Sequence, residues 1–379
     1  MTIRRAVSAG FAILAVSTAL PAGAEPMFLS KQYNRCSSCH YSASGGGLLT
    51  SYGRSLSGQE LSTFKRTSAP PAPEGKVSGE EAFLYGLLGD TLGPVALGVS
   101  LRPSYIHYEF GTFSDSRNPL MNADVAVAYR GHGWTGYGEV GRKPDIGTED
   151  SKAYSREHWV SFTAGNGLGV KGGRFLPAYG VHVADHTSFN RSNLGFDKYD
   201  QVYGVEVSYT SDRSLTQVSV SPGRAESIID DDGATAFNTT GRVQFDFGPK
   251  VVVVGSGFYR AESDVEVQSG AVGGALGLAP LRRLTIWTEG DAHLQDDGAG
   301  TSFVFVNETS WEVVRGVWAK FTPQGRTGSD LVPGVFRWGI GASLFPRTHW
   351  NFTFNFYRDS IEDTDEALKT FLAQLHIYL

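Results

Sequence analysis

The clearest structural signal in the sequence is the stretch Trp350-Asn351-Phe352-Thr353-Phe354-Asn355-Phe356-Tyr357. Its even positions are aromatic, and its odd positions carry Asn, Thr, Asn and Tyr. This is the two-residue period of a β-strand with one apolar face. The same period occurs at residues 125–129, 243–247 and 303–305. Because segments of about ten residues alternate in this way from Val95 onward, separated by turn residues, the pattern predicts a transmembrane antiparallel β-barrel.

The spacing of the turns predicts the size of the barrel. Short links are expected at residues 131–133, 165–167, 211–213, 248–250, 280–283, 315–316 and 346–348. They alternate with eight longer polar stretches, at residues 112–118, 144–155, 177–200, 222–234, 261–264, 293–300, 323–333 and 359–369. Since outer-membrane barrels have short periplasmic turns and longer external loops, eight hairpins predict about 16 strands with both ends periplasmic. The last segment, Phe371 to Leu379, would close the barrel.

The same alternation predicts which charged side chains point into the lumen. On the lipid face at mid-bilayer, an Arg would cost about 2 to 4 kcal/mol. The charged residues expected inside are Arg102, Asp124, Glu139, Arg174, Glu206, Arg242, Asp246, Glu289, Asp291, Glu308 and Glu312. We interpret these as ordinary lumen residues and expect no catalytic side chain among them. The alternative fold is a soluble β-sandwich of two domains, which would bury its aromatic side chains.

The N-terminus has the features of an export signal. Arg4 and Arg5 precede an apolar run from Ala6 to Leu20, and Ala22-Gly23-Ala24 resembles a cleavage site. We therefore expect a signal peptide over residues 1–24 rather than an anchor helix. The mature chain would keep 31 basic residues (33 minus two) and 39 acidic ones, a net charge of -8. This charge excludes nucleic acid as an expected partner.

Both cysteines of the chain belong to one motif, Cys36-Ser37-Ser38-Cys39-His40. C-x-x-C-H is the attachment pattern for c-type haem. The two thiols can form thioethers to the two vinyl groups of one porphyrin, and the imidazole of His40 can then be the proximal iron ligand. The alternatives are a redox-active C-x-x-C and half of a zinc site, but the second zinc-ligand pair and the βαβ context are both missing. The motif predicts one covalent haem c.

The motif lies in a segment that needs support to fold. Residues 25–64 are too few to stabilise a core without a covalent or metal staple, which haem would supply. Gly45-Gly46-Gly47 would let the backbone approach the porphyrin edge or would form a flexible turn. A proline-rich stretch follows. We therefore expect a haem module at 25–64, a linker and adaptor at 65–94 and the barrel at 95–379. The apolar stretch from Ala82 to Leu88 would be a short plug or an adaptor.

This order of parts resembles the fused monohaem cytochrome-porins of the outer membrane, best known as Fe(II) oxidases of iron-oxidising bacteria. The family's Ala-x-Pro-x-Phe segment is matched by Ala24-Glu25-Pro26-Met27-Phe28. Its Leu-x-x-Phe-Gly-Arg-x-Phe segment is similar to Leu49-Thr50-Ser51-Tyr52-Gly53-Arg54-Ser55-Leu56. After the first match the iron oxidases carry Ala-Arg-Gln-Thr-Gly, where this chain has Leu29-Ser30-Lys31-Gln32-Tyr33. The three glycines after His40 are more typical of the broader relatives.

The resemblance implies electron transfer across the outer membrane of a Gram-negative bacterium, as an Fe(II)-oxidising cytochrome. An extracellular donor such as Fe(II) would reduce the haem, and a periplasmic c-type cytochrome would remove the electron. Because the hydrocarbon layer is about 25 Å tall, a lone haem can serve only if it is held in or against the lumen. The alternatives are a diffusion porin whose haem is a structural plug or gate, and electron export to an external acceptor.

The second axial ligand of the haem is left open by the sequence. The candidates are Met27, nine residues before Cys36, then His182 or His186, and an open or exogenous site. The long loop at 177–200 also carries hard ligands that suit iron transiently, a pattern that would make it a contact site for the donor. Those residues are His182, Asp185, His186, Asp197 and Asp200. A constriction loop and a solvated surface are the alternative interpretations of this loop.

Overall fold

A computed structural model describes twelve parts of the chain. These are residues 26–42, 47–64, 79–87, 93–142, 153–183, 185, 187–196, 200–222, 236–262, 267–295, 300–328 and 332–379. The expected signal peptide, most of the linker, Gly45, Gly46, His186 and Asp197 lie outside these residues.

Short helices make up the described N-terminal part. Their bounds are η1 Pro26–Lys31, α2 Cys36–Cys39, α3 Ser51–Leu56, η2 Ser57–Leu61, η3 Gly79–Glu81 and η4 Phe83–Gly86. One more helix, α4 Phe189–Ser192, lies in the connection between β6 and β7. Within the described ranges, no helix has the length and apolar character needed to span a membrane.

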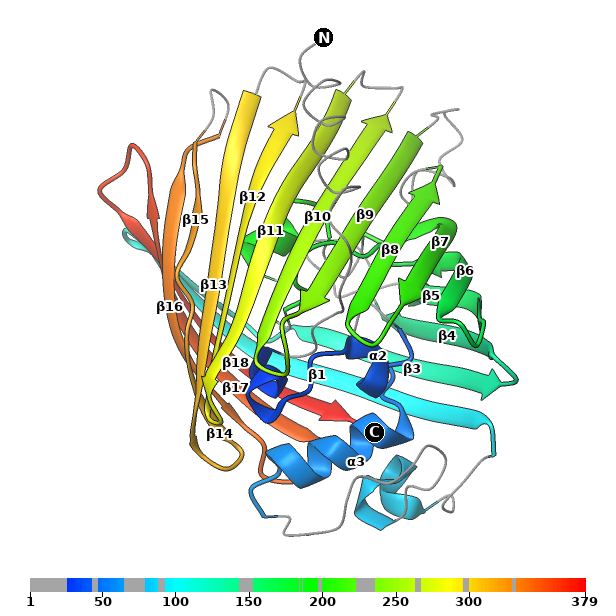
Figure 1. Cartoon of the computed structure of the whole chain (residues 1–379). Helices are drawn as coiled ribbons and strands as arrows, with labels where there is room; N and C mark the ends of the chain where they lie inside the picture. Colours follow the sequence, from blue (N-terminus) through cyan, green and yellow to red (C-terminus); the bar gives the residue numbers. More distant parts are fainter. Residues whose placement is uncertain are drawn as a thin grey trace.

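All other elements are antiparallel strands of a single sheet. Their bounds are β1 Val95–Phe110, β2 Phe113–Arg117, β3 Leu120–Gly131, β4 Trp134–Arg142, β5 Ala153–Thr163, β6 Leu168–Phe175, β7 Val202–Thr210, β8 Ser214–Ser221, β9 Ala236–Asp246, β10 Val251–Glu262, β11 Val267–Leu281, β12 Leu284–Gln295, β13 Gly300–Val314, β14 Val317–Phe321, β15 Gln324–Arg326, β16 Val335–Leu344, β17 Trp350–Ile361 and β18 Ala367–Tyr378. Consecutive strands pair, and β1 also pairs with β18, Ser100 opposite Tyr378, so the sheet closes into a barrel (Figure 1).

The eighteen segments form sixteen strands. β2 and β3 both pair with β1, and β14 and β15 both pair with β13 and β16. Each pair is therefore one strand with an interruption, and eighteen minus two gives sixteen. A proline lies in each gap, Pro119 in the first and Pro323 in the second. Proline lacks the N–H that the ladder needs, which explains both breaks. The predicted barrel of about 16 strands is confirmed.

The seven predicted short links are confirmed, and the long stretches need two corrections where the structure describes them. In the stretch 323–333, residues 324–326 form β15, which pairs with β13 and β16. All seven short links fall between consecutive strands, for example at residues 132–133 and 315–316. The sequence predicts an external loop over 112–118, but residues 113–117 form β2, and Gly111 and Thr112 alone make the turn. Four of the five side chains of β2 are exposed. A strand that projects beyond the lipid needs no apolar face, so its polar sequence resembles a loop.

The outward face of the barrel is apolar. Its exposed side chains include Val125, Val127, Val205, Val207, Phe303, Phe305 and Phe354, with exposed fractions of 40 to 61%. Exposed aromatic residues lie within four positions of the short turns, namely Trp134, Phe162, Phe247 and Trp311. Such an apolar belt with an aromatic girdle on a closed barrel is stable only in lipid. The fold is therefore a porin-like barrel of the outer-membrane type.

The inward face carries the predicted charges. Ten of the eleven charged residues expected in the lumen are buried, and the eleventh, Arg102, lines an internal cavity. Two further basic side chains pair with them: Lys171 Nζ lies 2.9 Å from Glu206 Oε1, and Arg156 Nη2 lies 2.8 Å from Asp124 Oδ2. The attraction within each ion pair offsets part of the free-energy cost of removing these charges from water.

Candidate functional site

The N-terminal segment of residues 26–64 lies within the barrel at the end that carries the short turns (Figure 1). Its first helix, η1, packs on β11, β12 and β13. Leu29, 1% exposed, shares an apolar cluster with Val252 and Trp287 of the wall. Burial of a leucine contributes about 1.5 to 3 kcal/mol. Lys31 Nζ lies 2.5 Å from Glu312 Oε2 of β13. The segment is therefore part of the barrel interior.

Hydrogen bonds to the rim hold the segment at several points around the barrel. Arg35 Nη2 donates to the carbonyl oxygen of Ser211 in the β7–β8 turn (2.7 Å). The guanidinium of Arg54 donates to the carbonyl oxygen of Leu97 on β1. The N–H of Thr63 donates to the carbonyl oxygen of Phe345, which follows β16 (2.8 Å). These contacts involve different strands, so no single part of the wall carries the segment.

The C-x-x-C-H motif forms helix α2 and is hydrogen-bonded to the start of α3. Its two cysteines begin and end α2, and both are 4% exposed. His40 ends the helix and donates its N–H to the carbonyl oxygen of Cys36 (2.8 Å). The N–H of Thr50 donates to the carbonyl oxygen of Cys39 (2.8 Å), and the Thr50 hydroxyl caps α3 by accepting from the N–H of Gly53 (3.1 Å). The motif therefore has a fixed position relative to α3.

Gly53 is the closest contact between α3 and the motif. A Cβ atom there would lie 2.3 Å from the carbonyl oxygen of Cys39. Only a residue without a side chain allows this approach. The neighbouring Arg54 is buried and reaches β1, as described above. Packing thus accounts for the Gly-Arg pair on which part of the family resemblance rests.

The cysteine environment does not favour thiol chemistry. Burial raises the pKa of the Cys39 thiol to about 12, and the nearby Cys36 adds to this. Redox-active cysteines instead need a lowered pKa, so that the thiolate is present at neutral pH. Among the described residues, no group of three or more His, Cys, Asp or Glu side chains is placed to hold a metal ion.

A cavity of about 260 Å³ lies between the segment and the barrel wall. Its volume is close to the lower end of the range for small-molecule sites, about 300 Å³. Cys36, Cys39 and His40 line it together. Its lining also includes the apolar residues Phe28, Leu48, Leu49, Leu61 and Phe345 and the cationic residues Arg54, Arg102, Arg156 and Arg191. Three carboxylates, Asp124, Glu139 and Glu157, line the cavity as well, and Arg156 pairs with the first two. A porphyrin has an apolar ring and two anionic propionates, and the apolar side chains and Arg102 suit these two features.

The connection between β6 and β7, residues 176–201, folds inward over the cavity. The rings of Tyr179 and Phe196 stack with centroids 4.5 Å apart, and Phe258 of the wall packs against both. Tyr179 Oη donates to Asp291 Oδ1 (2.7 Å) and Asn190 Nδ2 donates to Glu289 Oε2 (2.8 Å). The paired lumen carboxylates therefore anchor this loop, as expected of a constriction loop.

The residues predicted in this loop do not form one site in the described part of the chain. His182 lines the cavity. Burial lowers its pKa well below the usual value, and the positive charges of Arg191 and His40 contribute. Asp185 instead accepts a hydrogen bond from Tyr357 Oη of β17 (2.5 Å). His186 and Asp197 lie outside the described residues, and the Fe(II) contact site remains a prediction.

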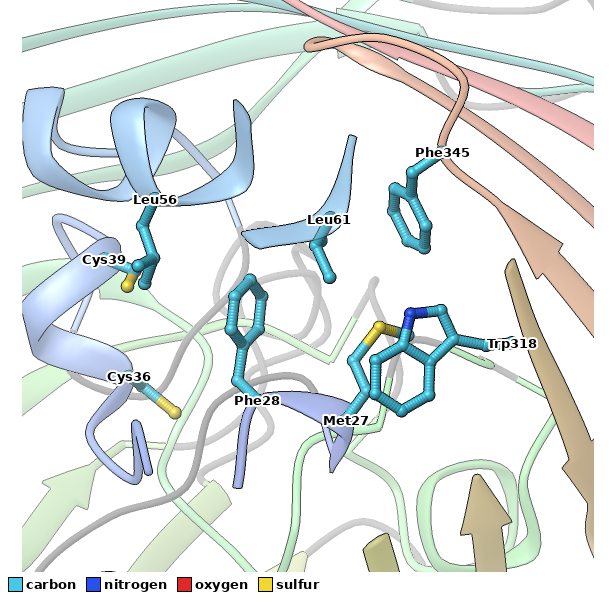
Figure 2. Packing of buried hydrophobic residues seen from close by; sticks show 8 residues of the cluster. All are labelled: Met27, Phe28, Cys36, Cys39, Leu56, Leu61, Trp318 and Phe345. Carbon is cyan, nitrogen blue, oxygen red and sulfur yellow. The ribbon is translucent and has the colours of Figure 1, made fainter. Parts of the chain in front are cut away.

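The other predicted ligand, Met27, is 1% exposed and lies in an apolar cluster with Trp318 and Phe345. Figure 2 shows its side chain beside the indole of Trp318. Sequence reasoning missed two residues that line the cavity and carry ligand-type side chains, Met121 and His376. His376 shares the inward alternation of its strand with Tyr378, a signal that could have identified it.

The remaining sequence features are placed as follows. Gly47 has a φ of +59°, and a Cβ atom there would lie 2.4 Å from Tyr137 Oη of the wall, so this glycine serves close packing. Within the stretch predicted as a plug or an adaptor, the ring of Tyr85 lies 5.4 Å from that of His349 at the β16–β17 turn, and its hydroxyl accepts from Trp350 Nε1 (2.5 Å). Because this contact lies at the short-turn end, it favours the interpretation of the stretch as an adaptor over that as a plug.

Known structures with a similar fold include a porin and other outer-membrane proteins. Pseudomonas putida OprB matches with a TM-score of 0.60 and 6% identity, over 76% of this chain and 94% of that one. An anion-selective porin from Comamonas acidovorans matches with 0.56 and 10%, over 75% and 99%. Vibrio cholerae OmpT with loop L8 deleted matches with 0.56 and 14%, over 75% and 99%. Neither a protein-family model nor a curated protein matches the chain. At these identities the likeness shows the fold alone.

Proposed function

We propose that the chain holds one haem c in this cavity and transfers electrons across the outer membrane, as a relative of the fused cytochrome-porins. The observation that carries the proposal is the position of the C-x-x-C-H motif. Cys36, Cys39 and His40 line a cavity inside a lipid-facing barrel, together with apolar and cationic side chains. An electron carrier must sit at such a place to act across an insulating layer.

The residues of the cavity have separate roles in this proposal. Cys36 and Cys39 hold the haem through thioethers, and His40 is its proximal ligand. Phe28 and Leu49 exclude water from the ring, and Arg102 neutralises a propionate. When bound, the haem supplies a one-electron Fe(III)/Fe(II) couple.

The donor and acceptor follow from the resemblance and from the position of the segment. The segment lies at the short-turn end, the periplasmic end of bacterial barrels. A periplasmic c-type cytochrome would dock at this rim, and an extracellular donor such as Fe(II) would approach from the loop side. Each Fe(II) that loses one electron leaves Fe(III) outside. The outer-membrane location and the orientation belong to the same proposal.

A second candidate function is a diffusion porin in which the haem module is a structural plug or gate. Two solved structures of similar fold favour it, since their names describe an outer-membrane channel and an anion-selective porin. Electron export is the remaining alternative: the same site would pass electrons from the periplasm to an external acceptor.

The proposal is tested on the full chain, matured with a cytochrome c assembly system and purified in detergent. We expect one covalent haem per chain by pyridine haemochrome analysis, and none in a Cys36→Ser, Cys39→Ser variant. Fe(II) should reduce the haem in stopped-flow absorbance, and a periplasmic cytochrome c should reoxidise it. A chain without covalent haem would refute the proposal. An open channel in planar bilayers with a haem that neither reagent oxidises or reduces would support the diffusion porin instead.

A further inference from the structure

We infer that His182 is the second axial ligand of the haem iron, with His40 as the first. The inference rests on the proposed function and deepens it, because it makes the inward loop of residues 176–201 part of the haem site. It assigns a role to an imidazole that the C-x-x-C-H motif and the barrel fold leave unexplained.

The neighbours of His182 fix the direction of its side chain. Val181 and Val183 are 6% and 4% exposed, and both pack into the apolar cluster of the wall with Val252 and Val254. The N–H of Val183 donates to the carbonyl oxygen of Val181 (3.0 Å). This three-residue turn has His182 at its apex. Because both flanking side chains point at the wall, the imidazole points away from it, and His182 accordingly lines the cavity.

The backbone around His182 is held by buried polar groups. The carboxylate of Glu289 accepts from the N–H of Val181 (2.9 Å), and Asn190 Nδ2 donates to the carbonyl oxygen of Val181 (3.2 Å). On the other side, Arg191 Nη1 donates to the carbonyl oxygen of Val183 (2.7 Å). These bonds hold the backbone on both sides of His182. The loop therefore presents the imidazole from a rigid support.

The position of His40 agrees with this assignment. His40 and His182 line the same cavity. Two other ligand-type side chains already have partners. Met27 packs against Trp318, and His376 Nε2 shares a hydrogen bond with a serine hydroxyl of β1 (3.2 Å).

Two imidazole ligands would leave no open position on the iron. The external donor and the periplasmic partner would then exchange electrons without binding to the metal, and small ligands such as CO would be excluded. A haem with one imidazole would instead be open to such ligands. This difference makes the inference measurable without an activity assay.

The experiment compares the full-length holoprotein with three variants, His182→Ala, His376→Ala and Met121→Leu. The two controls remove ligand-type side chains from the same cavity. We expect the wild-type haem to be six-coordinate and low-spin by absorbance and electron paramagnetic resonance. His182→Ala should be high-spin, should bind CO when reduced, and should regain the low-spin spectrum with added imidazole. Both controls should stay low-spin. Heat-modifiable electrophoretic mobility checks that each barrel is folded.

A low-spin His182→Ala haem that excludes CO would overturn the inference and leave the proposed function intact. A high-spin wild type would overturn it in the same way. If His182→Ala does not fold, His182→Met tests the same point, since a methionine ligand should raise the midpoint potential. An unchanged potential and spectrum in that variant would overturn the inference. Absence of covalent haem from the wild type would instead refute the proposed function itself.

Discussion

Two segments occupy the interior of the barrel, and they are held there in different ways. The inward loop of residues 176–201 is anchored by charged side chains of the wall, with Glu289 and Asp291 accepting from its backbone and side chains. The N-terminal segment of residues 26–64 has one such charged contact, between Lys31 and Glu312, and is otherwise held by scattered hydrogen bonds around the rim and by an apolar cluster. That cluster contains Cys36 and Cys39, which also line the cavity.

The difference indicates what each segment needs in order to be stable. The polar anchors of the loop are supplied by the protein itself. The N-terminal segment packs around a cavity, and its two cysteines belong to the apolar cluster and line this cavity. A segment of this size without a filled core is marginal. We therefore expect its stability to depend on what fills the cavity, while the stability of the loop does not.

The largest expected effect comes from the double variant Cys36→Ser, Cys39→Ser. It should lose covalent haem completely and leave residues 26–64 sensitive to limited proteolysis, because the cavity loses its occupant. The barrel and the loop of residues 176–201 should resist protease as in the wild type. Mass spectrometry of the fragments measures both regions at once. If residues 26–64 resist protease equally with and without haem, the stability of this segment does not depend on what fills the cavity.

The next effect concerns the loop. Glu289→Ala removes the acceptor of Val181 N–H and Asn190 Nδ2. An unsatisfied buried donor costs about 1 to 3 kcal/mol. We expect the loop to become the protease-sensitive region and the haem spectrum to change, with covalent haem still present. Glu308→Ala is the matched control, because this buried carboxylate pairs with Lys320 and accepts from the hydroxyl of Ser310, both on the wall. Equal proteolysis in the two variants would count against the anchoring role.

The sequence predicted the wall of the barrel well, since lipid and lumen impose opposite chemistry on alternate positions. Val125 is exposed and Asp124 is buried, as the two-residue period requires. The prediction failed where that constraint ends. Residues 114–117 are polar and follow the exposed Phe113 in a strand whose faces are both exposed, so alternation has no reason to appear there.

The site was predictable only in its covalent part. Cys36, Cys39 and His40 are neighbours in sequence, and their chemistry depends on that spacing. The orientation of His182 depends on Glu289, more than one hundred positions away, which accepts from the preceding backbone N–H. No local pattern encodes such a contact. Met27 is close to the motif in sequence, yet its side chain lies in the cluster around Trp318.

A smaller effect tests the packing of the motif on α3. In Gly53→Ala the new methyl group would lie 2.3 Å from the carbonyl oxygen of Cys39, so α2 and α3 must separate. Overpacking of this kind costs about 1 to 3 kcal/mol. We expect a reduced yield of covalent haem and a lower midpoint in denaturant for loss of the haem spectrum. Gly290→Ala is the control, since a Cβ atom there meets nothing within 4 Å. The same haem yield in both variants would show that α3 does not position the motif.

The smallest effect is expected at the rim. Arg35→Ala removes hydrogen bonds to the carbonyl oxygens of Ser211 and Asp212 in a short turn. Because water can replace the guanidinium at this half-buried position, the cost should be about 0.5 to 1.5 kcal/mol. The denaturant midpoint of the haem spectrum should fall by less than in Gly53→Ala, and the haem yield should not change. If Arg35→Ala instead released the segment as fully as loss of the cysteines, the rim would hold it in place, and the cavity would not need an occupant to order residues 26–64.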